Sequence, residues 1–481
     1  MLILNKIRAF AFVLLNLLNF FVQIKNRKLD KDKLILEILK KVDILTKRVQ
    51  YLEKENSELK ERLKKYEHPK TSGNSSVPPS KDENRVKRNQ SLREPTGKKP
   101  GGQEGRQGNT LKMVETPDHI EKYFPEYCNC CGKNITDLSF EFAGKRQVID
   151  IPEIKFNVTE HQIYKRICSC GYTTKSSYPP QVVAPVSYGQ NIESLIGYFH
   201  TRQYVPFKRL QEIFNDVFLV PISEGGIHYL LNKLVKKAEP AYKIIKHKLL
   251  SNKGGAIGAD ETGMKINGNK NWAWTWQNNE ATFITISDNR GGNTIDDNFM
   301  NGFVNSVLVH DCWKSHFNTP ALSHQICTAH LLRELKYLSE RYNHKWSNAF
   351  KLLLLSGIKL KNKLTEVNYL YPIPQRESLR KRLKILIDYQ IDQKDKELFV
   401  FQKRMKKYEE FIFTFLYYSG VPPDNNASER AIRNIKVKQK ISGQFKSTGG
   451  GHNFAVLRSI TDTIIKNNQN PLNSLKIIAN L

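Results

Sequence analysis

Two stretches decide the fold: Gly-Ala-Ile-Gly-Ala-Asp at residues 255–260 and Ser-Val-Leu-Val-His-Asp at residues 306–311. Each is a short apolar run that ends on a carboxylate. Between them, residues 272–276 and 282–286 alternate with a period of two. This alternation predicts a hairpin, because successive side chains of a strand point to opposite faces of the sheet.

The residues that follow complete a mixed pattern. A helix is predicted at 293–300, a fifth strand at 324–327 and a helix at 328–341. If the first and fourth strands are parallel neighbours, Asp260 and Asp311 lie at one edge of the sheet, where open α/β sheets bind ligands. Close carboxylates repel each other unless a cation lies between them, and oxygen ligands suit Mg²⁺. The alternative is that each aspartate merely ends a strand, and these two residues alone do not decide between the two interpretations.

A third acidic residue, Glu429, lies in the segment 421–433. Prolines and the cluster at 424–426 predict a turn and an N-cap, so a helix is expected to begin near Asn426, with Glu429 in its first turn. The alternative is an ordinary i,i+4 ion pair between Glu429 and Arg433, worth a few tenths of a kcal/mol. Without other evidence, the ordinary ion pair is the favoured interpretation of Glu429.

Four motifs, in this order, resemble those of the transposases of the IS66 insertion-sequence family. They are Asp260-Glu-Thr, Val309-His-Asp-Cys-Trp, Cys327-Thr-Ala-His-Leu-Leu-Arg-Glu-Leu and Asp424-Asn-Asn-Ala-Ser-Glu-Arg. The resemblance covers nearly all of the chain except residues 1–30. It implies a DDE enzyme with a ribonuclease-H-like core, whose catalytic acids are Asp260, Asp311 and Glu429. These acids are then expected to hold two Mg²⁺ (or Mn²⁺) ions per active site.

The predicted function is metal-dependent cleavage of DNA and strand transfer at the ends of an insertion sequence. Double-stranded DNA, of the element ends and of the target, is the expected partner, and the resemblance also implies small accessory proteins of the same element. Two alternatives stay open: a non-catalytic dimeric DNA-binding protein with a degenerate core, and a structure-specific nuclease. Metal-dependent nicking distinguishes the transposase from a non-catalytic DNA-binding protein. Strand transfer to a second duplex distinguishes it from a nuclease.

The composition favours a polyanionic partner. A formal charge of +29 over 481 residues indicates nucleic acid first and an anionic membrane surface second. Seven cysteines in a clustered pattern argue against a disulfide framework, so a reducing cytoplasm is expected. We therefore predict a cytoplasmic, nucleoid-associated protein without a membrane partner.

Residues 1–30 are an apolar segment of unclear status. Lys6 and Arg8 precede an apolar run at 9–24, as in a signal peptide, but no small-residue cleavage site follows. The run is also shorter than the roughly twenty residues of a membrane-spanning helix. A true start further downstream and a helix that packs on a partner both remain open.

Residues 31–67 predict a leucine-zipper-like coiled coil, as the same family carries. Spacings of four and three alternate along the seam, and Asn56 falls at an a position, which favours a parallel pair of helices. Homodimerisation is therefore favoured over a single amphipathic helix on the protein's own core. The seam consists of Val42, Leu45, Val49, Leu52, Asn56, Leu59, Leu63 and Tyr66.

Residues 68–110 predict a flexible basic linker, because they are poor in apolar residues and rich in Ser, Pro, Gly, Lys and Arg. Contacts with DNA phosphates and a merely solvated tether are equally compatible with this composition. The basic side chains concerned are Arg85, Lys87, Arg88, Lys98 and Lys99.

Two cysteine clusters predict a zinc-finger-like module at 111–180, and the family carries such a module here. Each cluster is followed by glycine, and four thiolates suit one structural, tetrahedral Zn²⁺. Free surface thiols and a redox pair are the alternatives, and Cys130 is a spare thiol that can substitute for one ligand. Alternation at 146–164 predicts strands between the clusters. The expected zinc ligands are Cys128, Cys131, Cys168 and Cys170.

Residues 181–250 predict a helical domain that resembles a helix-turn-helix. A helix begins at Phe207, a break follows at Val220-Pro221, and Ser223 is the N-cap of a second helix. In helix-turn-helix proteins the second helix enters the major groove. A plain helical hairpin has the same signature, and the basic composition favours DNA contact.

The catalytic domain is predicted at 251–445, with a helical insertion at about 344–416 that is too long for a loop, and a helical tail at 446–481. Cys327 and His330 have the spacing of half a metal site. Because no second ligand pair is evident, a role in the core or in gripping a DNA end is favoured. Basic side chains after the third acid are predicted to bind DNA, with a solvated helix face as the alternative. They are Arg430, Arg433, Lys436, Lys438 and Lys440.

The length predicts about three modules. The predicted fold class is multidomain α/β: a ribonuclease-H-like catalytic core, which is a mixed five-stranded sheet with helices and a helical insertion. The coiled coil, the zinc-binding β module and the helix-turn-helix-like domain precede this core.

Overall fold

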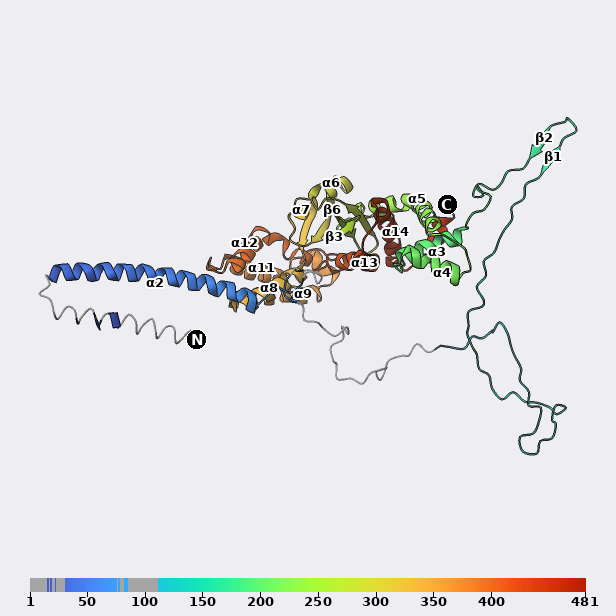
Figure 1. Ribbon diagram of the computed structural model, residues 1–481, viewed down its shortest axis with the longest axis horizontal. Helices are drawn as coiled ribbons and strands as arrows, with labels where there is room; N and C mark the ends of the chain where they lie inside the picture. The colour runs from blue at the N-terminus through green and yellow to red at the C-terminus, as the bar shows by residue number, and fades with distance from the viewer. Residues whose placement is uncertain are drawn as a thin grey trace. The chain divides into compact units, whose positions relative to one another are not determined.

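The computed structural model describes residues 15, 16, 18, 19, 22, 31–75, 77, 82–84 and 111–481 (Figure 1). Most of the apolar segment 1–30 and the five basic linker residues from Arg85 to Lys99 therefore lie outside the described residues. The chain divides into two compact units. The first comprises residues up to 85 with 332–352 and 390–400, and the second comprises 86–331, 353–389 and 401–481.

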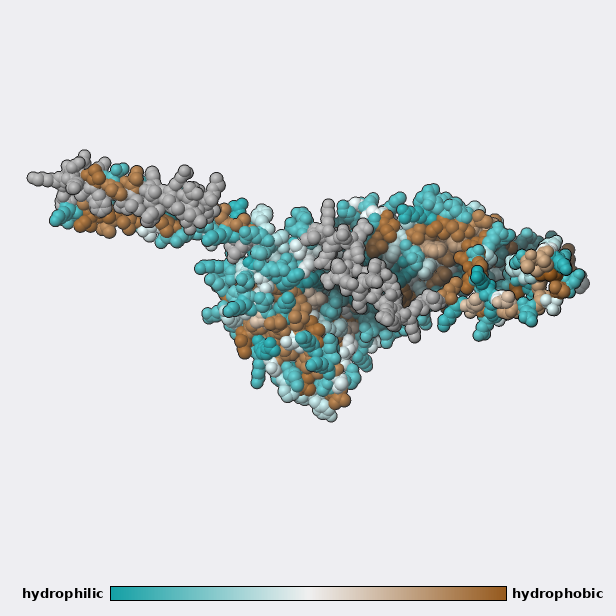
Figure 2. All heavy atoms as spheres, turned by 90° about the horizontal axis from the view of Figure 1, so that it is seen from below, coloured by the Kyte–Doolittle hydropathy of each residue, from teal (hydrophilic) through white to brown (hydrophobic). Residues whose placement is uncertain are grey.

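In the first unit, α2 (Lys31–Glu67) is one helix of 37 residues over the predicted coiled-coil segment. Hydrophobic side chains run along its surface (Figure 2). Seam residues remain exposed, for example Leu45 at 49% and Leu52 at 46%. Helices with such an exposed apolar stripe tend to associate, because association buries the stripe. Pairing with a second copy stays a prediction, with which one continuous helix is compatible.

The turn after α2 is held by polar contacts within the first unit. Lys70 Nζ lies 2.6 Å from Glu397 Oε1, and the amide of Asn74 donates to Glu340 Oε2 over 2.9 Å. Asn74 itself is buried. Polar contacts thus anchor the beginning of the predicted linker, a feature that its composition does not register.

The second unit contains a five-stranded mixed sheet with the order β5-β4-β3-β6-β7. β3, β4 and β5 are antiparallel neighbours, whereas β3, β6 and β7 run parallel. The predicted hairpin and the parallel pairing of the first and fourth strands are confirmed. The strands are β3 (Ala256–Ile266), β4 (Asn269–Gln277), β5 (Thr282–Ser287), β6 (Phe303–His310) and β7 (Ala321–Ile326), and α6 (Gly292–Asn298) lies between β5 and β6.

β3 is longer than predicted. The sequence indicated a strand that ends at Asp260, but β3 continues to Ile266 because the residues beyond Asp260 pair with β4. The parallel ladder with β6 covers Ala256–Gly258, opposite Val307–Val309. Asp260 therefore lies inside a strand, just past the point where β3 and β6 stop pairing, and Asp311 follows the last residue of β6.

Helices from both sides of the sequence share one hydrophobic core with the sheet. They are α3 (Gln190–Thr201), α4 (Phe207–Asp216), α5 (Glu224–Leu250), α14 (Thr448–Lys466) and α15 (Pro471–Ala479). As predicted, Ser223 caps α5, since its hydroxyl accepts a hydrogen bond from Gly226 N over 3.1 Å. Fully buried members of the core include Ile196 of α3, Leu234 of α5, Trp276 of β4 and Leu457 of α14.

A run of helices follows β7, as the sequence predicts. They are α8 (Thr328–Tyr342), α9 (Lys345–Lys361), α10 (Glu366–Leu370), α11 (Pro374–Asp388) and α12 (Lys396–Lys407). The 3₁₀ turns η1 (Glu409–Phe411) and η2 (Thr414–Leu416) then lead to α13 (Asn426–Ser442), which carries Glu429. Over the residues that the structure describes, no helix has both the length and the apolar character needed to cross a bilayer.

The predicted zinc module contains little regular structure. β1 (Lys165–Ile167) and β2 (Thr173–Lys175) form a hairpin around the second cysteine cluster, and an isolated bridge joins Tyr127 to Asn134 around the first. The strands predicted at 146–164 do not form, since these residues, all described, contain no strand, and β1 begins only at Lys165. Alternation is not sufficient for a strand, because its backbone groups also need a paired neighbour.

Gly258 marks the place where α13 crosses β3. A Cβ at this position would lie 2.4 Å from Ser428 Oγ and 2.6 Å from Asn425 Oδ1. Such distances are too short for any side chain, so a glycine is required for the helix to approach the strand this closely. The packing of α13, and with it the position of Glu429, depends on this contact.

We expect Gly258→Ala to lower the free energy of unfolding by about 1–3 kcal/mol, because the added methyl group overpacks the contact between α13 and β3. Urea denaturation measures this difference. The matched control is Gly263→Ala in the same strand, where the new Cβ would meet the Trp272 ring at 3.7 Å, an ordinary contact distance. Equal stability of the two variants would contradict the inferred close packing.

Candidate active site

Three acidic residues lie near one another at the end of the sheet where β3 and β6 stop pairing. Asp260 lies on β3, Asp311 directly follows β6, and Glu429 lies in the first turn of α13. All three are partly buried. Burial, and then the negative charges of Glu261, Asp311 and Glu429, raise the pKa of Asp260 well above its ordinary value. The structure thus brings the three predicted acids into one electrostatic cluster, which a cation would stabilise.

Short-range backbone contacts orient the two aspartates. Asp311 Oδ1 accepts a hydrogen bond from Trp313 N over 2.9 Å, and Asp260 Oδ1 accepts one from Glu261 N over 3.0 Å. The first of these closes a turn of the kind that Asp commonly forms with the backbone two residues on. Both carboxylates are therefore held in defined directions before any ligand arrives.

The turn before α13 is anchored to the sheet rather than capped in the predicted way. Asn425 is the N-cap residue, but its side chain makes no cap and instead donates to Ala259 O over 2.7 Å. Asp424 Oδ1 accepts from Asn426 N over 3.0 Å and closes the turn. Thr328 donates through its backbone N (2.9 Å) and its hydroxyl (2.8 Å) to Pro423 O. Tertiary anchors thus replace the helix cap and fix the start of α13.

Lys361, which the sequence did not single out, holds the segment that leads into this turn. Its ammonium donates to three backbone carbonyl oxygens, of Phe415 (3.0 Å), Tyr418 (2.9 Å) and Ser419 (2.8 Å). Burial lowers the pKa of Lys361 to about 8. One charged group therefore satisfies the carbonyls at the end of η2, which are otherwise left without helical partners.

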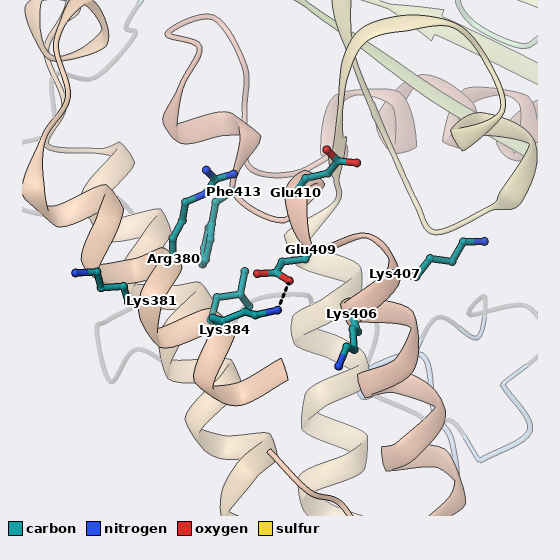
Figure 3. Close-up of a pocket in the computed structure, with 9 residues that line it drawn as sticks. Arg380, Lys381, Lys384, Lys406, Lys407, Glu409, Glu410 and Phe413 are labelled. Atoms are coloured by element: carbon teal, nitrogen blue, oxygen red, sulfur yellow. Dashed lines mark ion pairs between the residues drawn. The ribbon is translucent and has the colours of Figure 1, made fainter. Parts of the chain in front are cut away.

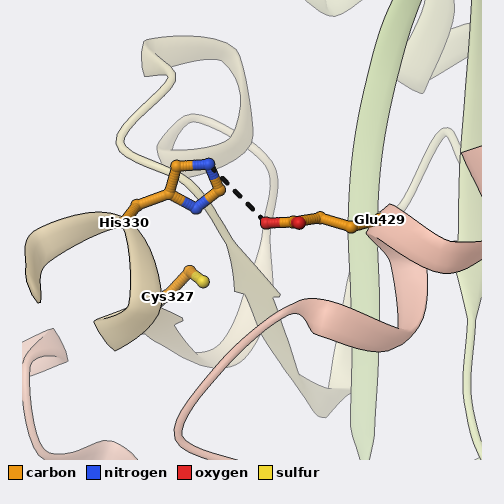
Figure 4. Close-up of side chains that lie close together, drawn as sticks. All are labelled: Cys327, His330 and Glu429. Atoms are coloured by element: carbon orange, nitrogen blue, oxygen red, sulfur yellow. Dashed lines mark ion pairs between the residues drawn. The ribbon is translucent and has the colours of Figure 1, made fainter. Parts of the chain in front are cut away.

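Glu429 faces two basic side chains and a thiol. Its Oε2 lies 3.6 Å from Arg433 Nη2, so the i,i+4 pair does form, but the Arg433 side chain is 72% exposed and such pairs contribute little. Its Oε1 lies 3.8 Å from His330 Nε2. Cys327, His330 and Glu429 converge in Figure 4, and one ligand atom from each lies within 4.8 Å of the others. Burial raises the pKa of the Cys327 thiol to about 11.

Glu261, next to Asp260, points to the opposite face of β3 and forms a buried ion-pair network that sequence reasoning missed. Its Oε1 accepts from Arg290 Nε over 2.9 Å, and its Oε2 lies 3.1 Å from His316 Nε2. Burial alone would raise the pKa of Glu261, but the hydrogen bonds from His316 and Arg290 outweigh it and lower the pKa. The one available signal was period-two alternation, which places a carboxylate at a position facing the interior.

Three buried histidines lie behind Asp311. His310 Nδ1 contacts the carbonyl oxygen of Asp311, so this nitrogen carries a proton and donates it. His310 Nε2 is then the acceptor for His324 Nδ1 at 3.0 Å. The His310 and His316 ring centroids are 5.1 Å apart. Burial, and then the charge of His316, lowers the pKa of His324 to about 4, so His324 is neutral at physiological pH.

We expect the free energy of unfolding to fall as the pH drops below about 6.5. The folded-state pKa of His324 lies below the unfolded value of about 6.5, so its stabilising contribution is complete above pH 6.5 and is lost on the way to pH 4. At pH 5 the loss is on the order of 2 kcal/mol. His324→Gln should remove this part of the slope in denaturation curves recorded from pH 7 to 5, whereas His247→Gln, at an exposed position, should not. Parallel pH profiles for wild type and His324→Gln would refute the assignment.

The five basic residues predicted to bind DNA have different environments. Arg430, Arg433 and Lys440 are exposed on α13. Lys436 donates to Gly263 O. Lys438 is buried at 3% exposure, and burial lowers its pKa to about 8. The structure therefore argues against a DNA contact by Lys438, because helical periodicity turns this position toward the core.

Within each cysteine cluster, glycine closes a tight turn. Gly132 N donates to Cys128 O, and Gly171 N donates to Cys168 O, each over 2.9 Å. Both glycines have positive φ, +70° and +86°, a region that other residues rarely adopt. The glycine after each cluster is thus explained by the geometry of the turn.

These turns direct backbone N–H groups at one thiol of each cluster. The pKa of Cys128 is lowered, chiefly by the backbone N–H of Cys131, and that of Cys168 chiefly by the backbone N–H of Cys170. Stabilised thiolates are what Zn²⁺ requires, so Cys128 and Cys168 each fit a ligand role. Among the described residues, however, no three of the predicted zinc ligands lie close enough together to share one ion. Cys130, the spare thiol, is exposed.

A cavity of about 560 Å³ lies between α11, α12 and η1, within the helical insertion (Figure 3). Both signs of charge line it, and Lys384 Nζ lies 3.6 Å from Glu409 Oε2. None of the predicted site residues lines this cavity. It is therefore separate from the acid cluster.

Comparison with known proteins supports the sequence motifs. Residues 185–453, more than half of the chain, match the Transposase IS66 family, and residues 125–171 match the zinc-finger binding domain of transposase IS66. A search of curated proteins finds no match. The first matched range includes all three acids, and the second includes both cysteine clusters. The chain therefore belongs to the IS66 family of transposases.

Proposed function

We propose that the protein is a DDE transposase that cleaves DNA at the ends of an insertion sequence and transfers the strands to a target. The observation that carries this proposal is that three separate segments bring Asp260, Asp311 and Glu429 to one end of the sheet, where β3 and β6 stop pairing and α13 begins against β3. The strand order β5-β4-β3-β6-β7, with acids on β3 and directly after β6, supports a ribonuclease-H-like core.

The donor set fits Mg²⁺ or Mn²⁺. Asp260, Asp311 and Glu429 offer only carboxylate oxygens, which hard cations prefer. Burial, and then the neighbouring negative charges, raise the pKa of Asp260, and a bound cation would offset both effects. Two such ions, when bound, activate the attacking water or 3′-hydroxyl and stabilise the leaving oxygen. The chain supplies the alignment: the sheet fixes both aspartates, and the anchored start of α13 delivers Glu429.

DNA binding follows from charge and from position. Arg430, Arg433 and Lys440 are exposed on the helix of Glu429, where they can pair with phosphates near the acids. The α4–α5 pair and the zinc module are further candidates for contacts with the element ends. We also propose that α2 pairs two copies, so that two ends are held together, and that the protein works in the cytoplasm at the nucleoid.

Asp311→Asn should reduce cleavage of duplexes that carry the inverted repeats flanking the gene by on the order of a thousandfold or more, because a metal ligand is lost. Binding of the same labelled duplex in a mobility-shift assay should be unchanged. Asp297→Asn, at an exposed position on α6, is the matched control and should cleave normally. Normal cleavage by Asp311→Asn removes this residue from the active site.

The same assay separates the alternatives. A non-catalytic DNA-binding protein shows no cleavage at any Mg²⁺ or Mn²⁺ concentration. A structure-specific nuclease cleaves but does not join the cleaved 3′ end to a second duplex, so products of strand transfer exclude it.

We further propose that Cys128, Cys131, Cys168 and Cys170 hold one structural zinc ion. Native mass spectrometry of Cys131→Ser should show one zinc fewer per chain than the wild type, since three thiolates bind zinc much more weakly than four. Cys130→Ser should keep the full number. Equal zinc content of Cys131→Ser and the wild type would contradict this ligand set.

A further inference from the structure

We infer that Cys327, His330 and Glu429 form a second metal site, separate from the zinc module, which takes a zinc-class ion and competes with the acid cluster for Glu429. The metal-binding part stands on its own, whereas the competition rests on the proposed function. The three residues come from two helices that begin near each other. Cys327 directly precedes α8, His330 lies in the first turn of α8, and Glu429 lies in the first turn of α13 (Figure 4).

The geometry suits an ion with short bonds. One ligand atom from each residue lies within 4.8 Å of the other two. The His330 Nε2 to Glu429 Oε1 distance of 3.8 Å exceeds an ordinary hydrogen bond. A tetrahedral ion with bonds of about 2.0–2.1 Å to nitrogen and oxygen separates such ligands by roughly 3.3 Å. A shift of about half an ångström therefore brings the His330 and Glu429 ligand atoms to the separation that such an ion requires.

The ligand types select a different metal from the one that the acids select. Thiolate and imidazole suit Zn²⁺ and related transition metals, whereas Mg²⁺ prefers oxygen ligands alone. Three protein ligands leave a fourth position open, as in many reactive zinc sites. On binding, the ion replaces the proton of the Cys327 thiol, which leaves to solvent. Asn425 N donates to Cys327 Sγ over 3.2 Å, a hydrogen bond that stabilises the resulting thiolate.

The framework around the site is already rigid. Asn425 also donates to Ala259 O, and Thr328, the residue after Cys327, donates to Pro423 O. These bonds tie the start of α8 and the start of α13 to each other and to β3. The ligands are thus held near their final positions in the absence of metal, which lowers the ordering cost of binding.

Glu429 is the shared element. Its Oε1 faces His330, and the turn of α13 that carries it begins against β3, where Asn425 donates to the carbonyl oxygen of Ala259, the residue before Asp260. A zinc-class ion bound to this carboxylate withdraws it from the Mg²⁺ ions of the acid cluster. Occupancy of the second site is therefore expected to inhibit DNA cleavage.

The binding test uses the metal-stripped full-length chain titrated with Co²⁺, which absorbs in the near ultraviolet when a thiolate is bound. Cys327→Ser and His330→Gln are each expected to lose one class of binding, with at least a tenfold weaker affinity. Cys312→Ser, at a neighbouring cysteine outside the proposed site, is the matched control and should titrate as the wild type does. Circular dichroism establishes whether each variant folds. Because His330 is only partly buried, His330→Gln still tests the site if Cys327→Ser does not fold. Unchanged titration of a folded His330→Gln overturns the site.

The competition test measures Mg²⁺-dependent cleavage while Zn²⁺ is added. Zn²⁺ should inhibit the wild type, and Cys327→Ser should need at least tenfold more Zn²⁺ for the same inhibition. Equal inhibition of both proteins overturns the competition for Glu429. If the wild type does not cleave DNA under any condition, the proposed function fails, and the Co²⁺ titration still decides whether the metal site exists.

Discussion

The contact between α13 and β3 at Gly258 is the constraint on which the acid cluster depends. Glu429 lies far downstream of the two aspartates, and the insertion helices intervene. It joins them because α13 begins directly against β3, where the Asn425 amide bonds to Ala259 O and no side chain on Gly258 is in the way. Lys361 secures the preceding segment by binding three carbonyl oxygens. Close packing and hydrogen bonds thus hold the three carboxylates near one another despite their mutual repulsion.

Neighbouring residues of β3 show how environment separates two identical functional groups. Asp260 and Glu261 point to opposite faces because strand side chains alternate. Glu261 meets Arg290 and His316, and its pKa falls, so this carboxylate is fully paired inside the protein. Burial, and then the neighbouring carboxylates, raise the pKa of Asp260. The first arrangement stabilises the fold, and the second costs stability until a cation binds, which is typical of functional sites.

The sheet could be predicted from sequence because its information is local. Alternation at 272–276 and 282–286 gave the hairpin, and two apolar runs that end on aspartates gave the parallel pair. The length of β3 could not be predicted, because residues beyond Asp260 depend on pairing with β4 across the sheet. Likewise, alternation at 146–164 led to a wrong prediction of strands, since nothing local reveals whether a partner strand exists.

The site was predictable only as far as residue types and motifs reach. The three acids came from sequence motifs, but their anchors, Asn425 and Lys361, are defined by tertiary contacts to backbone groups that no sequence pattern identifies. Lys438 was included among DNA contacts for its charge, although its position on α13 faces the interior. The Glu261 network was missed because a buried carboxylate is interpretable only once its partners are known.

Cys327 and His330 show that a sequence pattern can point to a metal site without identifying all of its ligands. Their spacing is that of half a metal site, and the sequence contains no evident second ligand pair. The structure supplies Glu429 instead, from the helix that also completes the acid cluster. A carboxylate can serve either set, because it ligates both hard and borderline cations. If both sites bind metal as proposed, the metals present decide which set holds Glu429, since zinc-class ions bind nitrogen and sulfur ligands far more strongly than Mg²⁺ does.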